Sequence, residues 1–245
     1  MVLDAGVQKP VTWDAALEKV TTIISGSGGT AVALVSPSTS TESLFLLKEI
    51  LSGLECTGAF RVNMVAGDVP LPGMEDLALR EERAPNAAGA RLLGYGEGFD
   101  EALESVAGAS VLFVLDESLE GVPAATLSGA ANVIYMGSEL PETATGATVV
   151  LPSTTLAEED GCFVNRDGRV QRYHAARPAP GEARPGWQVL SELLAKLDRG
   201  EAVVTAAEAF ALLAGSEGAF EDLSYDALGQ RGATVRDGQT KGVGE

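Results

Sequence analysis

The chain has 245 residues, 45% of them hydrophobic, which is enough to bury a sizeable core. Its 35 acidic and 17 basic residues give a formal net charge of -18, which repels phosphate backbones and anionic bilayers, so we expect no nucleic-acid partner. No apolar run approaches the roughly 20 residues of a spanning helix, and the N-terminus lacks a signal pattern. We therefore expect a cytoplasmic protein without direct membrane insertion.

The first half of the chain alternates between helical and strand patterns. Apolar residues from Trp13 to Ile24 recur with the spacing of one helical face, and Thr12 is a suitable N-cap. The valine-rich run from 31 to 35 is typical of a parallel strand that is covered on both faces. The predicted elements of this half are a helix at 13–24, strand 31–35, helix 41–52, strand 60–64 and a helix around 75–82.

The second half continues the alternation and then changes to a hairpin. Its predicted elements are helices at 86–93 and 99–106, strands at 111–115, 132–136 and 147–151, hairpin strands at 162–165 and 169–173, and helices at 187–197 and 202–214. Alternating strands and helices imply right-handed crossovers. We predict an α/β fold with a doubly wound, mostly parallel Rossmann-like sheet, a hairpin and C-terminal helices. The expected division is a domain at 1–200, a helical extension at 201–230 and a flexible tail at 231–245.

The chain is poor in sulfur and imidazole donors. Cys56, Cys162 and His174 are its only thiols and its only imidazole, whereas iron–sulfur clusters and structural zinc each take four such ligands. We therefore predict no metal site and no catalytic residue, and we expect both thiols to stay reduced. A contact between Cys162 and His174 across the hairpin is geometrically feasible, but an inert thiol and a surface imidazole are the expected pair.

Three loops follow predicted strands and could bind a ligand, namely 36–41, 116–118 and 137–138. Ligands of doubly wound folds bind at the carboxyl ends of strands, and the hydroxyls of Ser36 to Thr41 could hydrogen-bond a phosphate or a carboxylate. Ordinary helix capping is the alternative for these hydroxyls. The glycines at 26–29 precede their strand, so they mark the end of a helix and not a dinucleotide fingerprint.

Two charged segments stand out near the hairpin. Glu158, Glu159 and Asp160 are adjacent carboxylates, which could bind a hard cation or perform acid/base work, although a polar turn is the default interpretation. From Arg166 to Arg184 the chain holds five arginines against two acidic residues, a locally positive segment in an acidic chain.

Several segments together resemble the molybdopterin oxidoreductase superfamily. They are residues 11–17, 35–37 with 41–42, 86–94, the block 151–171, 180–187 and 223–229. Each segment is weak alone, but their order over nearly the whole chain is specific. The resemblance is nearest to the branch found in the large iron–sulfur subunit of respiratory NADH:quinone oxidoreductase, that is, of respiratory complex I.

That resemblance implies a Rossmann-like lobe in the peripheral arm of a respiratory complex. Because the chain begins close to the Trp13 motif, we expect the iron–sulfur modules to lie in partner chains. The first hypothesis is thus a scaffold or accessory subunit of the arm, not catalytic alone, peripheral to the inner membrane through the complex. We expect no cofactor in this chain, and we do not expect a molybdenum or tungsten pterin dinucleotide.

The resemblance also indicates candidate site residues. A vestigial dinucleotide site would use Glu158, Gly161, Asn165 and Arg169. A surface for other peripheral-arm subunits would use Arg166, Arg172, Arg177 and Arg184. A second hypothesis is the pterin guanine dinucleotide-binding part of a formate-dehydrogenase-like molybdenum or tungsten enzyme, and a third is a stand-alone small-molecule-binding domain of Rossmann type.

Overall fold

The computed structural model describes residues 1–62, 64 and 67–236, and its centre is a seven-stranded sheet of order β2-β1-β9-β8-β7-β3-β4. The five mutually parallel strands are β3 (Thr30–Val35), β4 (Glu55–Phe60), β7 (Val111–Leu115), β8 (Val133–Gly137) and β9 (Val149–Pro152). A short antiparallel hairpin, β1 (Val2–Asp4) and β2 (Val7–Lys9), extends the sheet beyond β9. The sequence patterns missed this hairpin because its strands are short and none of their residues is buried.

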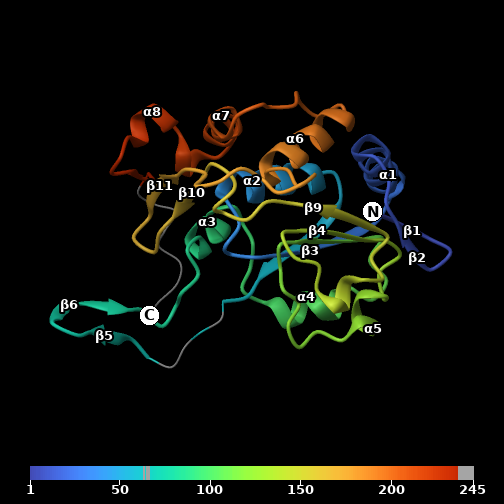
Figure 1. The fold of residues 1–245 in the computed structure, drawn as a ribbon, viewed down its shortest axis with the longest axis horizontal. Helices are drawn as coiled ribbons and strands as arrows, with labels where there is room; N and C mark the ends of the chain where they lie inside the picture. The colour runs from blue at the N-terminus through green and yellow to red at the C-terminus, as the bar shows by residue number, and fades with distance from the viewer. Residues whose placement is uncertain (63, 65–66, 237–245) are drawn as a thin grey trace.

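Helices cover both faces of the sheet (Figure 1). On one face lie α1 (Trp13–Gly26), α2 (Thr41–Leu51), α3 (Ala87–Leu92), α6 (Gly186–Lys196) and α7 (Ala206–Ser216). On the other face lie α4 (Phe99–Ser105) and α5 (Ala124–Leu127). In β3, Ala33 and Val35 join the first core while Val32 and Leu34 join the second, as the alternation of a strand requires.

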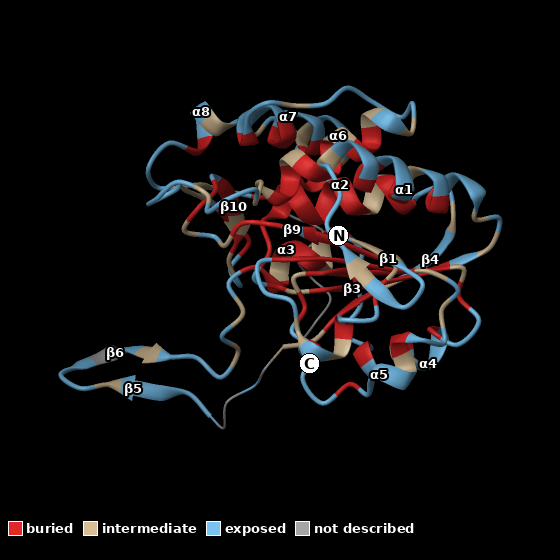
Figure 2. Cartoon of the chain, turned by 45° about the vertical axis from the view of Figure 1, so that its right-hand side comes forward, coloured by how far each residue is buried: buried red, intermediate tan, exposed pale blue. Residues whose placement is uncertain are grey.

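The buried layers of Figure 2 coincide with the sheet and the inner helix faces. All five residues of β7 and of β8 are buried, which explains why their unbroken apolar runs predicted parallel strands correctly. The α/β class and the mostly parallel central sheet are thereby confirmed. None of the helices in the described ranges is both long and apolar enough to cross a bilayer.

Two of the predicted elements are wrong. The strand expected at 60–64 lies at Glu55–Phe60, where the first residues of this edge strand are polar and exposed and so show no apolar run. The helix expected around 75–82 is instead a hairpin of β5 (Val69–Leu71) and β6 (Met74–Leu79). Its turn is Pro72-Gly73, and Gly73 has a φ of +75°, so a Pro-Gly turn overrides the weak helical periodicity.

The predicted hairpin after Pro152 is present. Strands β10 (Gly161–Val164) and β11 (Arg169–Tyr173) pair antiparallel, and Gly168 in their turn has a φ of +73°. A third strand, β12 (Ala233–Thr234), pairs with β11 although a flexible tail was expected from residue 231. Residues 237–245 of that expected tail lie outside the described residues. The remaining elements are α8 (Tyr225–Leu228) and 3-10 turns at Glu142–Ala144 and Gly218–Phe220.

Candidate functional site

After the neighbouring strands β3 and β7, the chain continues toward opposite edges of the sheet. From β3 the chain crosses to β4, and from β7 it crosses to β8 on the other side. Loops separate at such a switch point and leave a crevice, which is where open α/β sheets bind ligands. A cavity of about 240 Å³ lies there, lined by Ser36, Pro37, Ser38, Arg61, Arg83, Ala84, Asp116, Glu117 and Ser118. Two of the three loops singled out in the sequence meet at this cavity.

The two arginines of the cavity differ in how they are held. Arg61 pairs with the buried Glu117 at 2.7 Å, donates to the Glu120 carbonyl at 2.7 Å and lies over the Phe99 ring at 4.7 Å. Its charge is therefore already compensated. Arg83 donates from Nε to the Arg80 carbonyl at 3.1 Å, and no described carboxylate lies within ion-pair distance of it. Arg83 is thus the cation best placed to meet an anionic ligand.

Asp116 closes the cavity from the end of β7. Its Oδ1 accepts hydrogen bonds from the backbone N–H of Ser138 at 2.8 Å and from its hydroxyl at 3.0 Å. Burial raises the pKa of Asp116 above its ordinary value, and the Ser138 hydrogen bonds lower it in part. The residue has a φ of +50°, a strained conformation that non-glycine residues adopt mainly where the surroundings impose it. Asp116 therefore joins the loops after β7 and β8 in one fixed arrangement.

A second, small cavity of about 20 Å³ continues the crevice and shares Ser38 and Asp116 with the first. Thr39 and Thr154 also line it, and its volume admits about one water molecule. The buried hydroxyl of Thr39 has no hydrogen-bond partner in the described part of the chain. A buried hydroxyl without a partner costs free energy, so this edge of the crevice is built to receive a donor or acceptor.

A buried carboxylate, Glu159, also lines this cavity. Glu159 accepts hydrogen bonds from the Gly186 N–H at 2.9 Å, the Thr154 hydroxyl at 2.9 Å and the Tyr173 hydroxyl at 3.1 Å. Burial, with repulsion from Glu42, raises the pKa of Glu159 to about 7 in spite of these donors. Glu159 thereby ties the hairpin to the start of α6.

Glu42 forms the second half of this buried polar cluster, in the first turn of α2. Its carboxylate accepts from the Cys162 N–H at 3.0 Å and from the Tyr225 hydroxyl. The side chain is fully buried, and burial raises its pKa. Sequence reasoning missed both roles, because an acidic residue near a turn or a helix start is ordinarily exposed.

The four residues proposed for a vestigial dinucleotide site do not converge on one cavity. Glu158 accepts from the Thr155 N–H and pairs with Arg177 at 2.6 Å, and these partners hold its pKa below the ordinary value. Asn165 Oδ1 accepts two N–H groups of the hairpin turn, those of residues 167 and 169. Arg169 donates to the Arg231 and Gly232 carbonyls at 3.3 Å. Their contacts are structural, and their role in ligand binding stays a prediction.

The fourth of these residues, Gly161, is explained by packing. A Cβ at this position would lie 2.6 Å from the Tyr173 hydroxyl and 3.0 Å from the Ser40 Cβ. We expect Gly161→Ala to lower the free energy of unfolding by about 1–3 kcal/mol, since Tyr173 must shift away from Glu159. Urea denaturation measures this. Gly146→Ala is the matched control, because nothing lies within 4 Å of its added Cβ; equal effects of the two variants would contradict the packing explanation.

The arginines proposed for a partner surface make contacts within the chain. Arg172 lies over the Tyr225 ring at 5.3 Å, and Arg184 pairs with Glu192 and lies over the Trp13 ring at 4.7 Å. Arg166 lies 3.6 Å from Asp167, and both side chains are exposed. Arg177, paired with Glu158, keeps 65% of its side chain exposed. Binding of a partner by these residues stays a prediction.

The nucleophile and cation alternatives receive no geometric support. Cys162 is fully buried, and burial raises its pKa well above the ordinary value, whereas the His174 side chain is 68% exposed beside Asp160. The three adjacent carboxylates also point to different partners, since Asp160 accepts from the Ala175 N–H. In the described ranges no group of three or more His, Cys, Asp and Glu side chains is arranged to hold a metal ion.

Another cavity, of about 870 Å³, lies where the N-terminus of α1 faces the ends of β8 and β9. Apolar side chains such as Trp13, Leu140 and Val150 predominate in its lining. We place the candidate site at the switch point in spite of its smaller volume, because arginine side chains converge there with carboxylate and hydroxyl groups of the loops after β3 and β7.

Comparison with known proteins gives a family match for part of the chain. Residues 82–196 match the molybdopterin oxidoreductase family. The molybdopterin oxidoreductase segment thus runs from the end of the β5–β6 hairpin to the end of α6, and it includes Asp116 and Glu159. The loop after β3 lies outside it, so the match covers one wall of the crevice.

Curated relatives match shorter stretches. The chain is 40% identical over 92 residues to F420-dependent formate dehydrogenase 2 subunit alpha of Methanococcus maripaludis, which is 37% of this chain and 14% of the relative. It is 41% identical over 61 residues, 25% of the chain and 9% of the relative, to the assimilatory nitrate reductase catalytic subunit of Bacillus subtilis. The mitochondrial NADH-ubiquinone oxidoreductase 78 kDa subunit of Candida albicans is 40% identical over 63 residues, 26% of the chain and 9% of the subunit. The matched part is therefore less than a sixth of each of these relatives.

One prediction from the sequence is corrected by these matches. We expected no molybdenum or tungsten pterin cofactor, because the chain offers too few metal ligands. That expectation is wrong: the molybdopterin oxidoreductase match and the formate dehydrogenase relatives point to binding of a molybdenum or tungsten pterin cofactor. The error was to count metal ligands alone, since hydroxyls, guanidinium groups and backbone N–H groups can bind the phosphates of such a cofactor without contacting the metal.

Proposed function

We propose that this chain is the pterin guanine dinucleotide-binding part of a formate-dehydrogenase-like molybdenum or tungsten enzyme. The observation that carries the proposal is the crevice between β3 and β7, where Arg83, Ser36, Ser38 and Asp116 converge beside a segment that matches the molybdopterin oxidoreductase family. When bound, such a cofactor supplies metal-centred oxidation and reduction of a small substrate.

The residues of the crevice fit the nucleotide portion of this cofactor. Arg83 and the Ser36 and Ser38 hydroxyls offer donors for phosphate oxygens, and the Asp116 carboxylate offers an acceptor for ribose or base donors. The Thr39 hydroxyl adds a buried group that still lacks a partner. The crevice, at about 240 Å³, is below the roughly 300–1,000 Å³ of complete ligand sites. Further polypeptide is therefore required to enclose the whole cofactor.

The cofactor itself provides the first test. We expect the chain, purified without oxygen together with any chains that accompany it, to release about one pterin dinucleotide per chain on acid oxidation, detected by fluorescence. Elemental analysis should find molybdenum or tungsten in the same preparation. A preparation with neither pterin nor metal would contradict the proposal.

Guanosine diphosphate tests the crevice separately from the metal. We expect Arg83→Ala to weaken binding of this probe about tenfold, or about 1.4 kcal/mol, because a charge-assisted hydrogen bond to phosphate is lost. Isothermal titration measures the affinity. Arg231→Ala is the control, since this exposed arginine lies outside the crevice lining. If the two variants bound guanosine diphosphate with equal affinity, Arg83 would not be part of the site.

A second candidate function is an accessory subunit in the peripheral arm of an NADH:quinone oxidoreductase at the inner membrane. The match to the 78 kDa subunit of Candida albicans favours it. Under this candidate the chain copurifies with the iron–sulfur proteins of a respiratory complex. Identification of the chains that copurify with it therefore separates the two functions.

A further inference from the structure

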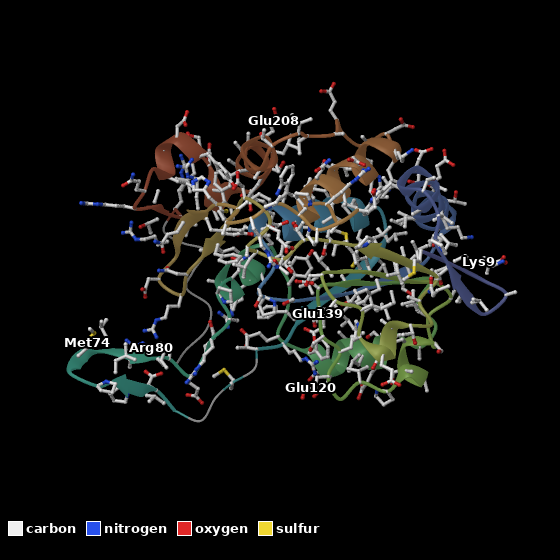
Figure 3. The ribbon with its side chains drawn as sticks, in the orientation of Figure 1. Lys9, Met74, Arg80, Glu120, Glu139 and Glu208 are labelled. Atoms are coloured by element: carbon white, nitrogen blue, oxygen red, sulfur yellow. The ribbon has the colours of Figure 1, made fainter. Side chains whose placement is uncertain are left out.

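The β5–β6 hairpin forms an arm that leaves the body of the molecule. It extends beyond the layers of helices and sheet in two orientations, with Met74 at its tip and Arg80 near its base (Figures 1, 2 and 3). Its two strands pair with each other and, among the described strands, with no third one. Two-stranded ribbons of this kind are marginally stable when they stand alone in water.

One face of the arm is apolar and exposed. Val69 pairs with Leu79 in register, so these two side chains share a face. Leu77 lies at the register shift between Pro70 and Leu71 and is also exposed. The exposed fractions of Val69, Leu79 and Leu77 are 46%, 47% and 54%, and Met74 at the tip is 55% exposed. Single exposed aliphatic residues need no explanation, but a contiguous group on a projecting ribbon marks an interaction site.

The arm is nevertheless fixed at both ends. At its base Asp68 accepts from the Glu81 N–H at 2.8 Å and pairs with Arg80 at 2.6 Å. At its tip the Pro72-Gly73 turn closes the ribbon, with Gly73 in the positive-φ conformation that the turn requires. A pre-formed ribbon loses little conformational entropy on binding, which favours association.

The charge of the arm restricts what can cover it. Residues 69–79 include two acidic and no basic residues, and the whole chain carries a net charge of -18. A second copy of the chain and an anionic bilayer are therefore both repelled. We propose that the arm docks another protein chain through an apolar groove rimmed by lysine and arginine. This inference does not depend on the cofactor.

The test compares a double variant of the arm with a variant at an exposed position elsewhere on the chain. The native assembly is first purified at low salt through a tag on this chain. After the partner is identified, we expect the double variant Leu77→Ser, Leu79→Ser to bind it at least tenfold more weakly in reconstitution. Raising sodium chloride to about 500 mM should weaken the wild-type complex too, because salt screens the negative charge of this chain from the basic rim. Val204→Ser is the matched control, since Val204 is 77% exposed in the loop before α7. This variant should bind the partner normally.

Hydrogen exchange of the wild-type chain tests the proposal without any substitution. The arm amides of the wild-type chain should exchange slowly in the assembly and rapidly in the isolated chain. Both variants should unfold at the wild-type temperature when isolated, because the changed side chains are exposed. The proposal would be overturned if the chain were recovered without a partner or if the arm exchanged equally in both states. It would also be overturned by arm-dependent dimers or by arm-dependent binding to phosphatidylcholine–phosphatidylglycerol vesicles.

Discussion

The Glu159→Gln variant is expected to gain stability over the wild type as the pH rises. The folded protein raises the pKa of Glu159 from 4.5 to about 7, because the carboxylate is buried and faces Glu42. The folded state therefore binds this proton more tightly than the unfolded chain does. The resulting stability is complete below pH 4.5 and is lost as the pH rises to about 7 and beyond.

The size of the effect follows from the shift in pKa. A rise of about 2.5 units corresponds to about 3 kcal/mol of unfolding free energy. We expect the difference in unfolding free energy between Glu159→Gln and the wild type to change by about this amount between pH 4.5 and pH 8, in favour of the variant. Urea denaturation at a series of pH values measures it. The amide of the variant does not titrate, so any free energy lost in its hydrogen bonds to Gly186 and Thr154 is the same at every pH. This loss therefore cancels when the difference is compared across pH.

The neighbouring Glu158 provides a control of opposite sign. The Thr155 N–H and Arg177 hold the pKa of Glu158 below its ordinary value, so its contribution is present at neutral pH and is lost as the pH falls. Glu158→Gln should therefore be most destabilising at neutral pH and least so in acid. If both variants showed the same dependence on pH, the burial of Glu159 would not be the cause.

The sequence predicted the parts of the fold that depend on buried apolar runs. Strands 111–115 and 132–136 were found because both faces of the parallel sheet are covered. Elements whose residues are exposed gave no such signal, which is why the β1–β2 hairpin and the polar start of β4 were missed. The β5–β6 arm was misread as a helix although Pro72-Gly73 marks a turn.

The site could be predicted only in part. The rule that ligands bind beyond the carboxyl ends of strands selected the loops at 36–41 and 116–118, and residues of both loops line the crevice. The switch point itself depends on strand order, which no local pattern contains. Burial of Glu159 was unforeseeable for the same reason: its donors Gly186 and Tyr173 come from elements that meet it only in the folded chain.

Asn86→Ala is expected to be the most destabilising polar substitution beside the candidate site. The fully buried Asn86 amide accepts from the Val164 N–H at 2.8 Å and the Thr41 hydroxyl at 3.1 Å, and it donates to the Thr39 carbonyl at 2.8 Å. Alanine leaves the Val164 N–H and the Thr39 carbonyl without that partner, whereas the Thr41 hydroxyl keeps the Cys162 carbonyl as an acceptor at 3.0 Å. We expect a loss of about 3–5 kcal/mol in unfolding free energy, measured by urea denaturation.

Asn132→Ala is the matched control for this loss. Asn132 is half-buried and makes one long hydrogen bond, from Nδ2 to the Ser110 carbonyl at 3.3 Å, so its removal should cost about 1 kcal/mol or less. If Asn86→Ala lowered the unfolding free energy no more than Asn132→Ala does, the hydrogen bonds of Asn86 would not stabilise the fold.

The same substitution connects stability with the crevice. Asn86 holds the carbonyl of Thr39, the residue whose unpaired hydroxyl lines the small cavity, and it also holds β10 through Val164. Loss of the amide should therefore speed hydrogen exchange at residues 39–41 and weaken guanosine diphosphate binding, while exchange in β8 stays slow. Guanosine diphosphate binding at wild-type affinity by a folded Asn86→Ala protein would mean that the ligand does not reach the loop after β3, and the crevice would have to be bounded by β7 and β8 alone.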